Sequence, residues 1–250
     1  MKARLNNMKY EIQPLDWDSN YFGVSAAKVI INEELREKDF QEIKSQVRDF
    51  EFVVINNMDN AVENNHLIGL YSNAFLVDMN VQFEMEMKPA HSPSFYKVKN
   101  QYEKNEEILE IAKNAFNYSR FYNDPFLDGN LSRDIYFNWV NNSFEKAEKF
   151  FIVAEEGGQI FGFILFSIKN SKELVIELIS LAPASQGKGI GTKLISTVKH
   201  YAENNSLHKI KVGTQIDNLQ AMNFYAKKGF DFCSKASIYH YWPRKELSND

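Results

Sequence analysis

The feature that most constrains the fold is a glycine-rich stretch, Gln186-Gly187-Lys188-Gly189-Ile190-Gly191-Thr192. It follows the apolar run 174–181 and precedes a segment with apolar residues at helical spacing. A strand, a glycine-rich turn and a helix N-terminus in this order point backbone amides outward, and the helix dipole favours an anion there. Because glycine has no Cβ, a phosphate can approach the backbone closely. We interpret the stretch as a pyrophosphate-binding turn; the alternative is a turn that only joins strand to helix.

The spacing of the glycines separates several kinds of phosphate-binding loop. A Walker loop requires Gly-Lys-Ser/Thr, and here Gly191 is followed by Thr192-Lys193. The dinucleotide fingerprint G-x-G-x-x-G fails because Thr192 stands where the third glycine belongs, counted from Gly187. The stretch resembles instead the pattern Q/R-x-x-G-x-G/A, with which the GNAT N-acetyltransferases hold the pyrophosphate of acetyl-coenzyme A.

Composition limits the class of protein. The 250 residues, 44% hydrophobic and 14% aromatic, suffice for one large domain or two small ones with a proper core. A net charge of −4 without a long basic block argues against a dedicated nucleic-acid binder. The N-terminus lacks the apolar core of a signal peptide, and no apolar run approaches the roughly 20 residues that cross a bilayer. Cys233 is the only cysteine, which excludes an internal disulfide. We expect a soluble cytoplasmic protein without membrane or nucleic-acid partners.

Hydrophobic periodicity predicts the order of helices and strands. The strongest signal is strict alternation of apolar residues from Phe75 to Met85, which predicts a half-buried strand. In the first half we expect strands at 9–13, 51–55 and 74–87, loops at 14–24 and 118–126, a linker at 91–106, and helices at 33–49, 106–117 and 131–147. In the second half we expect strands at 150–155, 159–168, 174–182, 209–214 and 231–242, a helix from the glycine-rich stretch to 204 and another at 219–228.

A second motif follows one predicted strand later. Residues 218–230, with Asn218, Ala221, Tyr225 and Gly229-Phe230, match the GNAT signature N-x-x-A-x-x-x-Y-x-x-x-G-F at every fixed position. The chain thus resembles the GNAT superfamily, which implies an α/β (α+β) fold whose mixed, mostly antiparallel, twisted sheet is flanked by helices. We expect an N-terminal α/β region at 1–117 that contributes to acceptor binding, and a catalytic domain that binds acetyl-coenzyme A at 118–250.

Within this superfamily the chain resembles the dTDP-fucosamine acetyltransferases. The resemblance implies acetyl transfer to the amine of a dTDP-linked 4-amino-4,6-dideoxy sugar for surface-polysaccharide synthesis. It is carried by short segments: Leu15-Asp16-Trp17-Asp18-Ser19, Phe22-Gly23, Phe75-Leu76-Val77-Asp78, Ser119-Arg120-Phe121, Asp124-Pro125 and Val212-Gly213-Thr214-Gln215. The alternatives are a GNAT enzyme for another small amine or a protein N-terminus, and a non-catalytic module that binds acetyl-coenzyme A. A homodimer is a reasonable expectation for such an enzyme.

The resemblance also assigns the donor site. The pantetheine arm is expected to pair with the strand before the glycine-rich turn, and Tyr225 is expected to protonate the leaving thiolate. A phenol whose pKa is near 10 is protonated at neutral pH and can therefore donate. Asn218 is expected to bind the pantetheine arm, to cap its helix, or to do both. The predicted donor-site residues are Ile179, Ser180, Leu181, Gln186, Gly187, Lys188, Gly189, Ile190, Gly191, Thr192 and Asn218.

The general base and the acceptor site are predicted from fewer residues than the donor site. Glu177 has the parity of Ile179 and Leu181, so it is expected on the same face, as a base acting through water or as an ion-paired carboxylate. Arg120 suits a nucleotide diphosphate because a guanidinium matches phosphate geometry; its alternative role is a surface salt bridge. The predicted acceptor-site residues are Trp17, Phe22, Asp78, Arg120 and Phe121, although aromatic residues also serve as core. The five histidines show no metal-ligand spacing, and we expect no metal.

Overall fold

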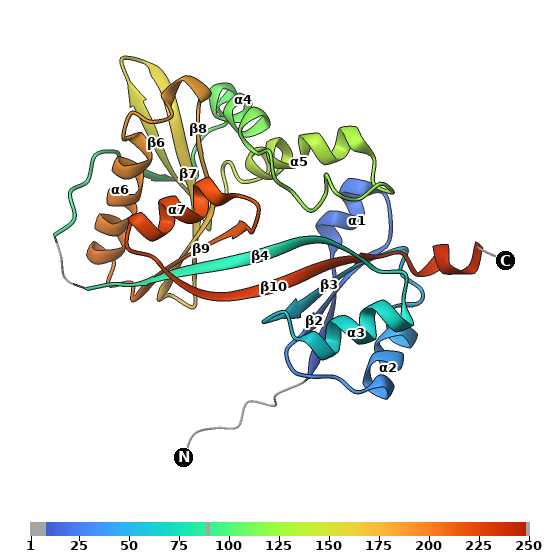
Figure 1. Cartoon of the computed structure of the whole chain (residues 1–250). Coiled ribbons are helices and arrows are strands. Elements are labelled where there is room, and N and C mark those ends of the chain that lie inside the picture. The colour runs from blue at the N-terminus through green and yellow to red at the C-terminus, as the bar shows by residue number, and fades with distance from the viewer. Residues whose placement is uncertain (1–8, 89–90, 249–250) are drawn as a thin grey trace. The chain divides into compact units, whose positions relative to one another are not determined.

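The computed structural model of the chain describes residues 9–88 and 91–248 (Figure 1). The chain divides into two compact units. The first contains the described parts of 1–81, 119–131 and 234–250, and the second contains 82–118 and 132–233. The segments 119–131 and 234–250, which we expected in a C-terminal domain, therefore belong to the same unit as the N-terminal residues. This division differs from a single boundary after residue 117.

The first unit is built on a mixed sheet with strand order β1-β2-β3-β10, and β4 follows β10 in this order. β1 pairs with β2 antiparallel, β2 with β3 parallel, and β3 with β10 antiparallel. Helices α2 and α3 cover one face, where their apolar side chains join those of β2 and β3 in one core. The elements are β1 (Tyr10–Pro14), β2 (Ala26–Ile31), α2 (Glu37–Val47), β3 (Phe52–Met58), α3 (Val62–Tyr71), η2 (Pro243–Ser248) and parts of two longer strands, β4 (Phe75–Glu86) and β10 (Asp231–Tyr241).

Our expectation of a loop at 14–24 is wrong, because residues Asp16–Phe22 form the short helix α1. Gly23 ends this helix in the left-handed conformation, with φ of 68°, and its amide donates to the Ser19 carbonyl. The Ser19 hydroxyl donates to the Leu15 carbonyl and accepts from the Ala26 amide, which fixes the exit into β2. The strand β2, the helix α3 and the strand β5 (Val98–Asn100), inside the expected linker, were not predicted.

The second unit contains the order β4-β9-β8-β7-β6-β5. The neighbours from β5 to β8 are antiparallel, and β8 pairs with β9 parallel. Tyr201 of α6 packs on Phe150 and Phe166, whereas Phe144, just after α5, stacks on Phe151. Neighbouring residues of a strand point to opposite faces, so α6 covers one face of this sheet and the α5 region covers the other. The elements are α4 (Glu106–Ala115), α5 (Gly129–Asn141), β6 (Phe150–Glu156), β7 (Gln159–Lys169), β8 (Glu173–Leu181), η1 (Pro183–Ser185), α6 (Ile190–Asn204), β9 (Lys209–Gln215) and α7 (Leu219–Lys227).

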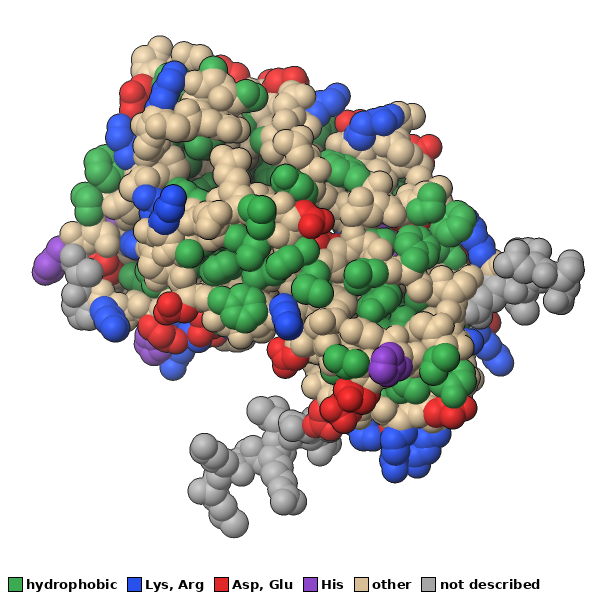
Figure 2. Space-filling view, viewed as in Figure 1, with side chains coloured by type: hydrophobic (Ala, Val, Ile, Leu, Met, Phe, Trp, Pro, Cys, Tyr) green, Lys and Arg blue, Asp and Glu red, His purple; other side chains and the backbone are tan. Residues whose placement is uncertain are grey.

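The expected fold class, a mixed sheet flanked by helices with an N-terminal extension, is confirmed. The strands predicted at 150–155, 159–168, 174–182, 209–214 and 231–242 correspond to β6 to β10. Figure 2 shows hydrophobic side chains gathered over α7 and the neighbouring strands, where Ile216, Leu219 and Phe232 are exposed. Among the described residues, no helix is both long and apolar enough to traverse a lipid bilayer.

Candidate functional site

The glycine-rich stretch forms the turn from η1 into α6. Gly187 and Gly189 have φ of 75° and 78°, a conformation that residues with a Cβ rarely adopt. Gly189 is the N-cap of α6. Within the described part of the chain, no amide from Gly187 to Thr192 donates a hydrogen bond, whereas the Gln186 amide donates to the Pro183 carbonyl. The start of this helix therefore presents free N–H groups and a positive dipole end, which fit the pyrophosphate of acetyl-coenzyme A.

The third glycine of the motif has a different role. Gly191 lies in the first turn of α6, and a Cβ at this position would lie 3.2 Å from Cζ of Phe224 in α7. It would also lie 3.8 Å from the side chain of Leu181. The absence of a side chain thus lets α6 pack closely against α7 and the end of β8.

The strands β8 and β9 separate toward their carboxyl ends. Their parallel pairing runs from Glu173 opposite Lys209 to Ile176 opposite Val212, although β8 continues to Leu181 and β9 to Gln215. Residues 179–181 still pair with β7 on the other side. The backbone of Ile179–Leu181 that faces β9 lies beyond the ladder between the two strands, and this geometry fits the expected pantetheine arm. The Ser180 hydroxyl is buried without a hydrogen-bond partner among the described residues.

A β-bulge in β8 overturns the expected orientation of Glu177. Leu165 pairs with Leu178 and Phe166 pairs with Ile176, so Glu177 is an extra residue in the ladder. Leu181 approaches α6, as its contact with the Gly191 position shows. Glu177, however, contacts Trp139 of α5, on the opposite face. The expectation that Glu177 shares a face with Ile179 and Leu181 is therefore wrong, because the inserted residue changes the alternation.

The Glu177 carboxylate is held by a lysine. Lys149 Nζ donates to both Oε1 and Oε2 of Glu177 at 2.6 Å, and Trp139 Nε1 donates to Oε2 at 3.4 Å. Burial alone would raise the pKa of Glu177, but the hydrogen bonds and charge of Lys149 outweigh it and bring that pKa below its ordinary value. Glu177 is thus an ionised, ion-paired carboxylate beside the separating ends of β8 and β9.

Tyr225 and Asn218 lie on α7 and at its start. The Tyr225 side chain is 3% exposed and its ring packs against Phe83, Phe224 and Phe230. Burial raises the pKa of the Tyr225 phenol above its ordinary value, so the hydroxyl keeps its proton throughout the neutral range. The Asn218 side chain accepts from the Ala221 amide at 3.1 Å and caps α7, which leaves its amide group as a donor.

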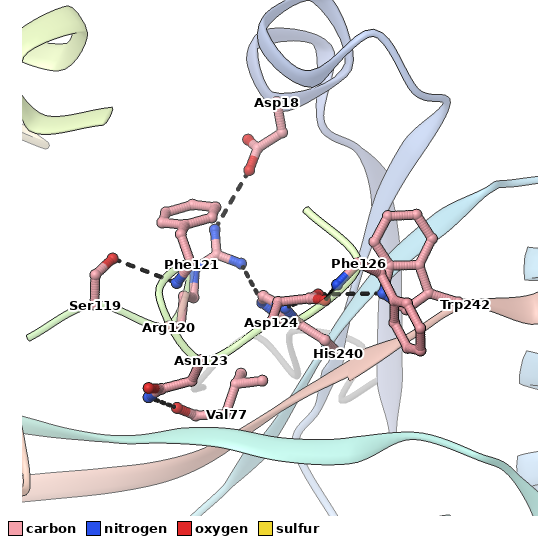
Figure 3. A network of polar contacts seen from close by, with 10 residues as sticks. All are labelled: Asp18, Val77, Ser119, Arg120, Phe121, Asn123, Asp124, Phe126, His240 and Trp242. Atoms are coloured by element: carbon pink, nitrogen blue, oxygen red, sulfur yellow. Dashed lines mark hydrogen bonds and ion pairs between the residues drawn. The ribbon is translucent and has the colours of Figure 1, made fainter. Parts of the chain in front are cut away.

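In the first unit, Arg120 belongs to a network of polar contacts that joins α1, the segment 119–126 and residues 240–242 (Figure 3). Arg120 Nη2 lies 3.4 Å from Asp18 Oδ1, and Nη1 lies 3.3 Å from His240 Nε2. His240 Nδ1 lies 2.6 Å from Asp124 Oδ2, which also accepts from Trp242 Nε1 at 3.1 Å. The guanidinium carbon is 4.1 Å from the centre of the Phe121 ring. These contacts hold Arg120 in one orientation.

The histidine in this network is neutral. His240 is fully buried, and burial lowers its pKa from 6.5 to about 4 despite the opposing effect of Asp124. A neutral imidazole carries one proton, and the 2.6 Å contact with the carboxylate assigns it to Nδ1. Nε2 therefore accepts a hydrogen bond from Arg120. Figure 3 shows Asp124 between His240 and Trp242.

The other expected acceptor-site residues also lie in the first unit. Trp17 is 37% exposed and stacks on Tyr21, and Phe22 packs on Phe121, which is buried. Asp78 is half-buried in β4, on the polar side of the alternating strand. Arg120 and Phe121 are thus brought together with Phe22, whereas Trp17 lies at the exposed edge of this aromatic group.

Sequence reasoning missed several residues of these two clusters. Lys149 precedes a predicted strand and belongs to no motif. Asp18, Asp124 and His240 stand in segments that we had noted, but nothing in the sequence linked them, because their separations exceed 100 residues. The pairing of a buried His with a buried Asp becomes visible only in the folded chain. No group of three metal-ligating side chains occurs among the residues that the structure describes.

Comparison with known families decides the class of protein. The family model for the acetyltransferase (GNAT) family matches residues 106–230, half of the chain. The chain belongs to this GNAT family. The match covers the glycine-rich turn, both motifs and the strands β6 to β9. One curated relative is the streptothricin acetyltransferase of Escherichia coli, which is 35% identical over 75 residues.

Other curated relatives match only part of their length. The spore coat polysaccharide biosynthesis protein SpsD of Bacillus subtilis is 29% identical over 141 residues, which cover 56% of this chain and 48% of that protein. The streptothricin acetyltransferase match covers 30% of this chain and 42% of that protein. The chain spans about half the length of the curated relatives that it matches.

Solved structures share the fold over nearly the whole GNAT chain. A conserved protein of unknown function from Staphylococcus epidermidis superposes with a TM-score of 0.65, at 12% identity, over 96% of this chain and 94% of that one. A GCN5-related N-acetyltransferase from Sphaerobacter thermophilus gives a TM-score of 0.61, at 12% identity, over 94% of this chain and 77% of that one. At this identity the likeness establishes the fold.

Proposed function

We propose that this GNAT protein is an N-acetyltransferase that moves the acetyl group of acetyl-coenzyme A to the amine of a dTDP-linked 4-amino-4,6-dideoxy sugar. The observation that carries the proposal is the turn at 186–192, whose free amides at a helix N-terminus fit a pyrophosphate. Membership in the GNAT family supports the same donor. In this proposal the second unit binds the donor, the first unit binds the acceptor, and the enzyme acts in the cytoplasm.

The donor is held by backbone groups. The amides of Gly187 to Thr192 bind the pyrophosphate, and the backbone of Ile179 to Leu181 pairs with the pantetheine arm beyond the end of the β8–β9 ladder. An N–H group in this stretch also donates to the carbonyl oxygen as negative charge develops on it. Bound acetyl-coenzyme A supplies the acetyl group as an activated thioester.

Tyr225 acts as the general acid in this proposal. Transfer of the acetyl group from sulfur to nitrogen leaves a thiolate, which takes the proton of the Tyr225 hydroxyl. The raised pKa of the buried phenol keeps that proton in place until the thiolate forms. The ring packing against Phe83, Phe224 and Phe230 fixes the direction of the hydroxyl.

Glu177 acts through water rather than by direct contact. Its carboxylate is ionised and tied to Lys149, so it is a weak base that orders a water molecule beside the amine. The amine proton leaves through this water after nitrogen attacks the carbonyl carbon. The position of Glu177 in the bulge, next to the separating strands, supports this role.

The acceptor is proposed from the first unit and from one relative. Arg120 presents a guanidinium fixed by Asp18, His240 and Phe121, which suits a diphosphate. The relative SpsD is named for spore coat polysaccharide biosynthesis, and this name supports a sugar acceptor. A different small amine or a protein N-terminus is the alternative acceptor.

One assay tests the proposal. The full chain is incubated with acetyl-coenzyme A and with dTDP-4-amino-4,6-dideoxygalactose, its C4 epimer, spermidine or a short peptide, and free thiol is followed. We expect turnover with one of the two dTDP sugars at a kcat/KM far above that with the other amines. Turnover with spermidine or the peptide alone would contradict the acceptor, and no turnover with any amine would favour a binding module.

A further inference from the structure

The face of the first unit's sheet opposite to α2 and α3, here called the polar face, carries Lys28, Asn56 and His240 among apolar residues. Strand pairing places Lys28 of β2 beside Val54 of β3, and Val54 beside His240 of β10. These three residues form one row across the sheet. Their neighbours Val53, Ile55 and Tyr241 point the other way, into the core beneath α2 and α3. Arg120 contacts this row through His240, so it lies over the polar face.

The next residue on this face of β3 is Asn56, which lies between Ile30 and Ile238. Its Oδ1 atom is buried without a hydrogen-bond partner among the described residues. An unsatisfied buried acceptor destabilises the folded chain, so a ligand that donates a hydrogen bond there recovers stability. Asn56 and Lys28 are diagonal neighbours, roughly 8 Å apart from the strand spacing and the rise per residue.

The charges above this face are unevenly matched. Lys28 and Arg120 both approach the carboxylate of Asp18, and Asp124 contacts the His240 ring at Nδ1 while Arg120 contacts it at Nε2. Burial and then the positive charge of Arg120 lower the pKa of Lys28, and Asp18 opposes this effect. Within the described residues, Lys28 makes no ion pair closer than 4 Å. An anion placed beside both cations would relieve their repulsion.

We propose that Lys28, Asn56 and Arg120 form the subsite that binds the diphosphate and an adjoining sugar or base of a nucleoside diphosphate sugar. Lys28 and Arg120 contact phosphate oxygens, and Asn56 Oδ1 accepts a hydrogen bond from a hydroxyl or ring N–H group. This assignment rests on the proposed acetyl transfer to a nucleotide sugar and adds two residues, Lys28 and Asn56, to its acceptor site. His240 and Asp18 are positioning residues that orient Arg120.

Calorimetry with the full chain tests the subsite separately from catalysis. The probes are dTDP, inorganic pyrophosphate and thymidine, and the variants are Lys28→Gln and Asn56→Leu. Lys38→Gln is the matched control, because it removes the same charge from an exposed position on α2. We expect Lys28→Gln to weaken dTDP and pyrophosphate binding by about tenfold or more, and Asn56→Leu to weaken dTDP but not pyrophosphate. Acetyl-coenzyme A affinity should be unchanged in all three variants.

Thermal unfolding distinguishes binding from structure at Asn56. Since Oδ1 has no partner, Asn56→Leu should leave the Tm unchanged or raise it, while dTDP binding falls. If the wild-type chain binds neither dTDP nor pyrophosphate, or if Lys28→Gln binds both as the wild type does, the subsite is refuted. Turnover of a nucleotide sugar with an unchanged KM in both variants would also refute it and would leave the proposed function standing. Absence of nucleotide-sugar turnover, with dTDP binding lost in Lys28→Gln, would refute the reaction but support the subsite.

Discussion

The Lys149 ammonium group donates to both oxygens of the Glu177 carboxylate, with Nζ 2.6 Å from Oε1 and from Oε2. The side chains are 19% and 10% exposed, so the pair is largely removed from water. The strand that carries Glu177 is bulged at this residue. The ion pair, the bulge and the end of the β8–β9 ladder therefore lie at the same point of β8. Removing Lys149 tests what the ion pair contributes to stability.

Lys149→Met should destabilise the protein by about 3 kcal/mol, because it leaves a buried carboxylate without its counter-charge. The lowered pKa of Glu177 contributes stability that is present above the unfolded pKa and lost as pH falls through the folded value. The variant should lose this contribution, so its stability should depend less on pH in the acidic range. Urea unfolding measures both effects. Lys169→Met, at an exposed position of β7, is the control, and an equal loss in both variants would contradict the assignment.

Tyr225→Phe should reduce kcat by roughly 10²-fold or more, the usual loss when a general acid is removed. The Kd for acetyl-coenzyme A and the Tm should change little, because the ring keeps its packing on Phe83 and Phe230. Tyr201→Phe, at another tyrosine whose burial raises its pKa, is the control and should keep full activity. A wild-type kcat in Tyr225→Phe would contradict the proposed role of Tyr225 as the general acid.

Gly189→Ala should weaken acetyl-coenzyme A binding. The residue has φ of 78°, and an alanine there costs about 1–2 kcal/mol in backbone strain. Its Cβ would also stand beside the free amides of the turn. Gly157→Ala, at φ of 62° in the β6–β7 hairpin, carries a similar strain without contact with the donor site. We expect a similar drop in Tm for both variants and a rise in the Kd for coenzyme A for Gly189→Ala alone; equal Kd values would contradict the role of the turn.

The neutral, buried His240 should make the protein less stable in mild acid. Burial lowers its pKa from 6.5 to about 4, so the unfolded chain binds this proton more readily than the folded one. Stability is therefore complete above pH 6.5 and declines as pH falls toward 4. Between pH 7 and pH 5 the loss from this group should be about 2 kcal/mol. Urea unfolding of the wild type and of His240→Gln at pH 7 and at pH 5 measures this loss. If the variant loses as much stability between the two pH values as the wild type does, His240 is not the source of the loss.

Local sequence pattern predicts most of the second unit, because its signals are short-range. Alternation predicts β4, the two glycines of the hairpin predict the β6–β7 turn, and the glycine-rich motif predicts the start of α6. In the first unit the signals are weaker. The helix α1 has only seven residues, too few for a period to show, and α3 buries only Asn64 and Ile68. Neither carries the apolar stripe by which a surface helix is usually recognised.

The residues of the candidate site can be predicted from the sequence where they belong to a local motif. Tyr225 and the turn at 186–192 belong to local patterns, and they lie in α7 and at the start of α6. Glu177 shows the limit of the period-two rule, because one inserted residue reverses the face on which later side chains lie. The contacts of Arg120 with Asp18 and His240 join positions separated by 102 and 120 residues, and no local pattern specifies such contacts.

The pairing of β3 with β10 has a consequence for how the chain is made. The Tyr239 hydroxyl of β10 donates to Asn65 Oδ1 of α3, across 174 residues of sequence. During synthesis, the edge of β3 that pairs with β10 therefore stays unpaired until β10 has left the ribosome. An open strand edge is an aggregation hazard, and contacts between distant residues form slowly. We infer that the pairing of β3 with β10 forms late and that this edge of β3 stays open to aggregation until it does.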